Sequence, residues 1–207
     1  GAGKTTLFNL ISAALKPKPG KIIFQGKDIT PLPAFKICRL GIARTFQTVK
    51  IFPNVPVVRN VMVGALFGTG HHMSSSEARK KAEEELEFVD LTPYKDLPAG
   101  DLTLAQQKRL EMARALSSNP KLLLLDELMA GLTPTEIAEA MGDVAEVRSR
   151  GITVIMIEHV MQAIMKISDR IVVLDYGKKI AEGTPAEIAS NPQVIEVYLG
   201  EECDAGN

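Results

Sequence analysis

The sequence predicts an α/β fold, with a mainly parallel sheet flanked by helices and an inserted α-helical subdomain. Short apolar runs alternate with helical stretches along most of the chain, which is typical of parallel sheets with helices on their faces. The later runs are apolar almost throughout, as expected of strands covered on both sides. Between about residues 48 and 118 no convincing strand occurs, which indicates the helical insert.

Five segments are expected to be strands. They are residues 21–25, 41–46, 122–126, 152–157 and 170–175. A helix should begin at Thr133, because Thr133, Pro134 and Glu136 match a capping box with proline at the first helical position. This helix should run to about Arg150 and end at Gly151.

The insert should contain at least two helices. Ser74 and Glu77 form a second capping-box pattern, followed by an apolar stripe at helical spacing. Another helix is expected from about Leu104 to Ser118. The predicted organisation is an α/β core in two parts, residues 1–47 and 119–207, around a helical subdomain at 48–118.

The composition narrows the class of partner. The 207 residues carry 24 basic and 25 acidic side chains, so there is no basic excess to favour nucleic acid. The longest apolar runs are far shorter than a membrane span, so we expect any membrane connection to go through another protein. Cys38 and Cys203 have neither a disulfide framework nor a metal spacing, which fits a reducing cytosol. Because the chain begins without Met and inside a motif, we interpret it as a fragment that has lost an N-terminal piece.

That motif is a phosphate-binding loop. Residues 1–6, Gly-Ala-Gly-Lys-Thr-Thr, match the second half of the pattern G-x-x-x-x-G-K-[ST]. In such loops backbone N–H groups close around phosphate oxygens, and Lys4 would reach the β- and γ-phosphates. The Thr5 hydroxyl would take Mg²⁺, and a helix from about Thr5 to Leu15 would direct its positive end at the anion.

The apolar strand 122–126 is the expected partner of this loop. It delivers Asp126 and then Glu127 to its carboxyl end, where parallel sheets bind ligands. Asp126 would hold Mg²⁺ through water, and Glu127 would orient or deprotonate the attacking water. Taken alone, the same residues would also fit a strand that ends in a solvated acidic turn.

Two polar residues follow other strands. Gln47 opens the insert and would contact Mg²⁺ and respond to the nucleotide, although a plain turn residue would look the same. His159 follows the strand 152–157 at the edge that carries Asp126, so it would contact the γ-phosphate and the attacking water. A single histidine is more often a capping or packing residue.

A third feature is the helix that follows Leu102. Thr103 and Gln106 match a capping box at its start. The segment is either an ordinary amphipathic helix or one that directs its N-terminus and the Thr103 hydroxyl at a second anion.

Together these motifs resemble an ABC transporter ATPase over essentially the whole chain. Lys4-Thr5, Gln47, the segment 102–106, Asp126-Glu127, the segment 130–134 and His159 occur in that family's order and spacing. Residues 41–47, 51–54, 60–64, 175–185 and 194–200 further resemble the ATPase subunits of high-affinity branched-chain amino acid importers.

The resemblance implies a function and a site. The chain would bind and hydrolyse ATP with Mg²⁺ to power uptake of branched-chain or related amino acids. Glu127, His159 and Gln47 would be catalytic, and Thr5, Gln47 and Asp126 would serve the metal. The nucleotide-binding residues would be Gly1, Ala2, Gly3, Lys4, Thr5, Thr6, Thr103, Ala105 and Gln106.

The resemblance also implies partners. Two ATPase subunits, identical or not, would sandwich two ATP molecules between the phosphate loop of one and the helix that begins at residues 102–106, the family's signature segment, of the other. They would lie in the cytoplasm on the inner face of the membrane, in contact with permease subunits. A periplasmic or extracellular solute-binding protein would be an indirect partner. The stretch from Gln47 to Gly64 is expected to meet the permease, and the alternative is that its apolar residues pack under the insert.

Three departures from the family pattern stand out. Leu104 and Ala105 replace two glycines of the signature, and Ala105 adds a Cβ where glycine backbone would face the γ-phosphate. Thr133 stands where the family often has Asp. The alternative functions are the ATPase of an envelope-lipid exporter, a non-transport ABC ATPase, a GTPase or small-molecule kinase, and a regulator that does not hydrolyse nucleotide.

Overall fold

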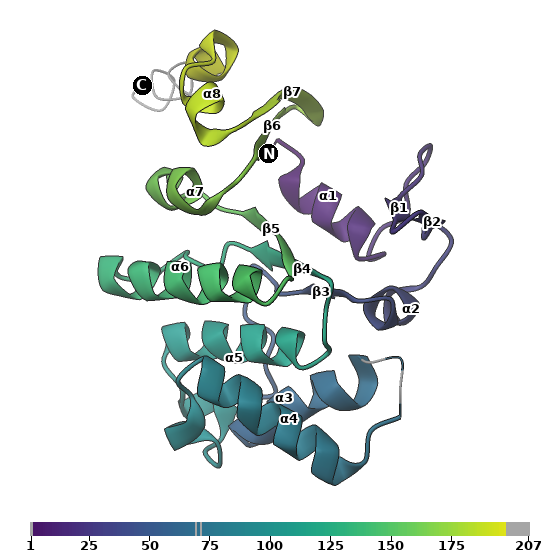
Figure 1. Cartoon of the computed structure of the whole chain (residues 1–207), viewed down its shortest axis with the longest axis vertical. Helices are drawn as coiled ribbons and strands as arrows, with labels where there is room; N and C mark the ends of the chain where they lie inside the picture. Colours follow the sequence, from purple (N-terminus) through teal and green to yellow (C-terminus); the bar gives the residue numbers. More distant parts are fainter. Residues whose placement is uncertain (1, 69, 71, 198–207) are drawn as a thin grey trace. The chain divides into compact units, whose positions relative to one another are not determined.

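The computed structural model describes residues 2–68, 70 and 72–197. These residues form alternating helices and strands, labelled in Figure 1. The α-helices are α1 (Lys4–Ile11), α2 (Ala34–Arg39), α3 (Val57–Gly68), α4 (Ser75–Phe88), α5 (Leu104–Leu116), α6 (Pro134–Ser149), α7 (Met161–Ile167) and α8 (Pro185–Ala189). The strands are β1 (Ile23–Phe24), β2 (Lys27–Asp28), β3 (Ile42–Arg44), β4 (Leu122–Asp126), β5 (Thr153–Ile157), β6 (Ile171–Asp175) and β7 (Lys178–Gly183).

The chain divides into two compact units. The larger unit is Phe8–Glu158, and the smaller unit combines the first seven positions with the described residues from His159 onward. The domain boundaries predicted from the sequence at residues 47 and 118 stay a prediction.

The larger unit is built on a parallel sheet in the order β3-β4-β5. Ile42 lies opposite Leu122, and Asp126 lies opposite Ile157. All five residues of β4 are buried, as expected of a central strand covered on both faces. A mainly parallel sheet with flanking helices confirms the predicted fold class.

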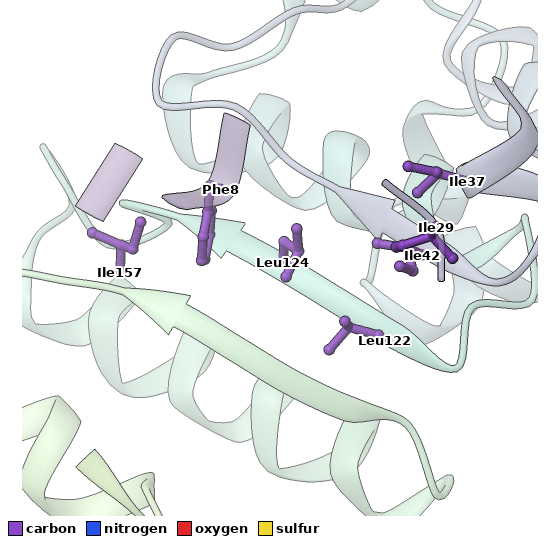
Figure 2. Close-up of a cluster of buried hydrophobic side chains, with 7 residues drawn as sticks. All are labelled: Phe8, Ile29, Ile37, Ile42, Leu122, Leu124 and Ile157. Carbon is purple, nitrogen blue, oxygen red and sulfur yellow. The ribbon is translucent and has the colours of Figure 1, made fainter. Parts of the chain in front are cut away.

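One face of β4 supports a cluster of buried side chains (Figure 2). Leu122 and Leu124 are two positions apart, so they point to the same face of the strand. The other members come from distant parts of the unit and are Phe8, Ile29, Ile37, Ile42 and Ile157. Their burial holds α1, α2 and the sheet together by the hydrophobic effect.

Helices α3, α4 and α5 form a helical layer in the same unit, in which each helix contacts the other two (Figure 1). Ser74 and Thr103 cap α4 and α5 through complete capping boxes, as the sequence predicts. Helix α3 was not predicted. Its Val57 and Val58 are 0% and 2% exposed, so these two residues of the stretch 47–64 belong to the core, while the docking of the stretch stays a prediction.

Several expected elements differ in extent. Helix α1 ends at Ile11 rather than near Leu15, because Ala13 takes a left-handed conformation with φ 56°. The strand expected at 21–25 shrinks to Ile23–Phe24, which pairs antiparallel with β2. β5 is not buried throughout, since its residues alternate between exposed and partly or fully buried.

The smaller unit contains an antiparallel pair, β6 with β7, and the helices α7 and α8. Its small core consists of Ala181, Ile188 and Val194. β6 is only partly buried, and it belongs to a two-stranded sheet whose other strand is β7. Helix α8 begins at a capping box formed by Thr184 and Glu187, which the sequence analysis did not identify.

Candidate functional site

The described part of the phosphate loop belongs to the smaller unit. Gly3 has a backbone φ of +91°, a conformation that residues other than glycine rarely adopt. The N–H of Gly177 donates to the carbonyl of Ala2 at 3.1 Å, which ties the loop to the turn between β6 and β7. Helix α1 begins at Lys4, and Thr5 and Thr6 are exposed at its start. Gly1, which the sequence also assigns to the nucleotide, lies outside the described residues.

Asp126 ends β4 with a fully buried side chain. Its Oδ2 accepts from Arg44 at 2.8 Å, and the side chains of the pair are 0% and 7% exposed. Its backbone N–H donates to the Thr45 hydroxyl oxygen at 3.3 Å. Oδ1 of Asp126 is buried without a hydrogen-bond partner. A buried carboxylate oxygen left unmatched is costly, so it marks a position where a further ligand would bind favourably.

Arg44 is a site residue that the sequence analysis missed. Besides Asp126, its guanidinium donates to Asn9 Oδ1 at 2.7 Å and to Ser12 Oγ at 3.0 Å. It also lies 5.6 Å from the ring centroid of Phe8 and 5.2 Å from that of Phe46. These contacts fix the cation at the end of β3 and hold the Asp126 carboxylate in one orientation.

Glu127 follows Asp126 in a left-handed backbone conformation, with φ 52°. Its N–H donates to the carbonyl of Ile157 at 2.9 Å. The Nε2 of Gln47 donates to Oε2 of Glu127 at 3.0 Å. The structure thus brings together two of the predicted catalytic residues, which lie 80 positions apart in the sequence.

The turn that carries Glu127 has two further buried partners. Lys108 of α5 donates through Nζ to the carbonyl oxygens of Glu127 and Leu128, at 2.8 and 2.9 Å. Glu158 accepts the N–H of Met129 through Oε1 at 2.9 Å. Burial lowers the pKa of Lys108, and the nearby carboxylates, Glu158 foremost, act in the opposite direction. The sequence analysis did not identify either residue.

The signature segment begins α5. The Thr103 hydroxyl accepts the N–H of Gln106 at 3.3 Å, and Gln106 Oε1 accepts the N–H of Thr103 at 3.0 Å. Thr103 and Leu104 are exposed, whereas Ala105 and Gln106 are partly buried. An open, well-capped helix start of this kind presents backbone N–H groups to the surface.

The remaining predicted residue, His159, is exposed and belongs to the smaller unit. The expected meeting of the phosphate loop and His159 with Asp126 and Glu127 would join the two units, so it stays a prediction. Within the larger unit, Gln47, Asp126 and Glu127 gather at the carboxyl ends of β3 and β4. Parallel sheets bind ligands at this edge.

Comparison with known families agrees with this geometry. Residues 1–130 match the ABC transporter family, and residues 178–204 match the family described as branched-chain amino acid ATP-binding cassette transporter. The chain is 42% identical to the high-affinity branched-chain amino acid transport ATP-binding protein BraF of Pseudomonas aeruginosa, covering 97% of this chain and 84% of BraF. It is 39% identical to LivG of Escherichia coli, of the same description, with the same coverage.

Solved structures give the same result. The ADP conformation of MJ1267, an ATP-binding cassette of an ABC transporter, superposes with a TM-score of 0.85 at 34% identity. The match covers 96% of this chain and 84% of that structure. A dimeric post-hydrolysis structure of the cassette MJ0796, bound to ADP and Pi, has a TM-score of 0.79 at 25% identity over 89% of this chain and 81% of MJ0796.

The fold and the matched segments define the class of this protein, a nucleotide-binding ATPase. More specifically, the chain belongs to the ABC transporter family, in which ATP hydrolysis is coupled to transport. The resemblance drawn from the motifs is therefore confirmed, and so is the enzyme class. In the described ranges, no helix combines the length and the apolar character that a membrane span requires.

Proposed function

We propose that this chain hydrolyses ATP to power the uptake of branched-chain amino acids. The observation that carries the catalytic part is the contact of Gln47 with Glu127, directly beside the buried Asp126. The solute is inferred from the names of BraF and LivG and from the family matched at residues 178–204. An envelope-lipid exporter or a non-transport ATPase has no comparable support.

Ala2, Gly3, Lys4, Thr5 and Thr6 would bind the phosphates, with Gly1 added by the sequence pattern. The first N–H groups of a helix have no partner within it, and Lys4 adds a positive charge at the start of α1. Both features favour an anion, and the left-handed Gly3 lets the backbone curve towards it.

Mg²⁺ would be held by Thr5, Gln47 and, through water, Asp126. The residues fit this ion, because Asp126 offers a buried carboxylate oxygen without a partner and Mg²⁺ prefers oxygen ligands. The bound ion would neutralise charge on the β- and γ-phosphates. Arg44 already neutralises the other oxygen of Asp126, so a single oxygen is left for this role.

Glu127 would act as the general base. Its carboxylate takes a proton from water, the water oxygen attacks the γ-phosphorus, and the bond to the β–γ bridging oxygen breaks to release ADP. Gln47 donates to the carboxylate and so holds it in place. His159 would contact the γ-phosphate and the attacking water.

A second ATPase subunit would complete each site. Thr103, Ala105 and Gln106 would contact the ATP bound to the phosphate loop of the partner subunit. The exposed start of α5 and the dimeric MJ0796 cassette support this arrangement. Both an identical and a related partner fit these observations.

An apolar groove supports docking to the permease. It has a volume of about 430 Å³, and most of its walls come from α2, α3, α5 and β3. Phe35 and Phe67, which line it, are 57% and 66% exposed. Large exposed aromatic side chains around a groove are typical of a surface that a partner covers. A cytoplasmic helix of the permease would fill it and hold this subunit at the inner face of the membrane, with a solute-binding protein acting on the other side.

Glu127→Gln tests the catalytic assignment in the assembled ATPase. It should keep ATP affinity and lose at least about 10²-fold in turnover, the usual scale for a lost general base. Glu139→Gln on α6 is the matched control and should hydrolyse ATP at the normal rate. Turnover near wild type in Glu127→Gln would refute the assignment.

Docking and solute are tested in the membrane complex. With cysteines placed singly in a cysteine-free background, Phe67→Cys should crosslink to the permease and the exposed Lys80→Cys on α4 should not. Equal crosslinking at both positions would argue against the groove. Uptake of labelled leucine by proteoliposomes should stop in Glu127→Gln, and uptake of a different solute class alone would contradict the transport assignment.

A further inference from the structure

The backbone turn that carries Glu127 is held from two sides by buried charges. Lys108 and Glu158 are each 6% exposed. Lys108 binds the carbonyl oxygens of Glu127 and Leu128, while Glu158 binds the N–H of Met129. Three consecutive residues of the turn therefore have a backbone group bound to a side chain from α5 or from the end of β5.

The burial of the charged Lys108 side chain has an energetic cost. Taking a charged lysine out of water carries a large desolvation cost, and an apolar side chain of similar length would fill the same space without that cost. The cost is offset here by two short charge-assisted hydrogen bonds and by the nearby Glu158 carboxylate. What these bonds hold is a residue in a disfavoured conformation, because Glu127 has φ 52°.

We propose that Lys108 is a positioning residue for Glu127, and that Glu158 completes the support from β5. Lys108 fixes the left-handed turn and thereby the direction in which the Glu127 carboxylate leaves the backbone. This inference rests on the proposed role of Glu127 as the base.

The same contact links α5 to the base. Thr103, at the start of α5, is assigned to the ATP of the partner subunit, and Lys108 lies five residues further along the same helix. At 1.5 Å per residue this is about 7.5 Å of rigid helix. A shift of α5 upon closing on the partner's ATP would pass through Lys108 to the backbone of Glu127. Each subunit would then orient its own base only while its signature holds the other nucleotide.

The test compares Lys108→Met with Lys81→Met in the assembled ATPase. Lys81 is the matched control, because it is a partly exposed lysine on α4 that pairs with Glu85 and does not contact the turn. Lys108→Met should lower kcat at least about tenfold, since a small misplacement of a catalytic group has effects of this size or larger. Its Kd for ATP should stay within about twofold of wild type, and Lys81→Met should change neither value.

A gentler variant covers the case in which Lys108→Met does not fold. Lys108→Gln keeps a donor but loses the charge, and it should lower kcat while leaving the Kd for ATP unchanged. Wild-type kcat in a folded Lys108 variant would overturn the proposal. If a Lys108 variant loses ATP affinity and turnover to the same extent, and its melting temperature falls in parallel, the proposal is also overturned. Such a result would indicate a merely structural role.

The Glu127→Gln background separates this proposal from the proposed function. If both are correct, Glu127→Gln alone abolishes turnover and Lys108→Met adds little to it. If Glu127 is the base but Lys108 does not position it, only Glu127→Gln has an effect. If Lys108→Met still lowers turnover about tenfold where Glu127→Gln has none, Lys108 acts through another group and the positioning role is refuted.

Discussion

The sheet edge and the helical layer of the larger unit are both tightly packed, yet they are sensitive to opposite changes. At the sheet edge the critical contact is electrostatic, the buried ion pair between Asp126 and Arg44. In the helical layer it is steric, because Gly64 of α3 lies against the backbone of α5 with no room for a Cβ. We therefore expect the first region to fail when a charge is removed and the second when volume is added.

The largest effect should come from Arg44→Met. It removes the cation but leaves the Asp126 side chain buried without its partner, and breaking one partner of such a pair costs about 3–5 kcal/mol of unfolding free energy. Denaturant titration at neutral pH measures this loss.

The double variant Arg44→Met with Asp126→Asn sharpens this result. It removes both charges, so it should recover much of the stability lost in Arg44→Met alone. If the two substitutions were simply additive, the ion pair would not be the source of the effect.

Gly64→Ala should have the next largest effect. A Cβ at this position would lie 2.1 Å from the carbonyl oxygen of Arg114 and 2.2 Å from Ser117 Oγ. Because the nearest atom is backbone, α3 and α5 must separate, at a cost of about 2–3 kcal/mol. Gly142→Ala on α6 is the matched control, since nothing lies near its would-be Cβ. It should stabilise the protein by up to about 1 kcal/mol, and a loss there as large as at Gly64 would contradict the steric explanation.

Asp143→Asn should have an effect of the opposite sign. Burial raises the pKa of Asp143 from 3.8 to about 6, even though Arg109 lies 3.5 Å away and acts to lower it. The folded state therefore binds the proton more tightly than the unfolded chain, and this carboxyl makes stability fall as pH rises from about 4 to 6. Asp143→Asn should gain up to about 3 kcal/mol at pH 7, because a pKa rise of about 2 units corresponds to a difference of this size. Melting curves at pH 4 and pH 7 measure the change, and an equal gain at both values would contradict it.

The fold was predictable wherever a local pattern decides the structure. β4 has the expected bounds, and α4, α5 and α6 begin at the capping boxes seen in the sequence. α8 has the same signal at Thr184 and was overlooked. α3 was missed, although Pro56 directly precedes its first residue, Val57.

The site was only partly predictable, for a physical reason. Gln47 and Glu127 each follow an expected strand, so their proximity follows from the rule that parallel strands end at one edge. Arg44 and Lys108 carry no such signal. The pattern around Arg44 suggests a plain strand, and its partner Asp126 is 82 positions away. The pattern around Lys108 suggests a solvated helix face, and its partners Glu127 and Leu128 are 19 and 20 positions away. Only the tertiary structure shows that these cations are buried.

The left-handed backbone at Glu127 has a consequence for redesign. Glycine or asparagine would suit that conformation better, so a sequence chosen for thermal resistance alone would discard the glutamate there. On the proposed role of Glu127 as the base, directed evolution under heat without selection for ATP turnover would yield proteins that are more stable but hydrolyse ATP slowly. Glu127 occupies a backbone conformation that glutamate disfavours, so a screen for stability alone would select against it.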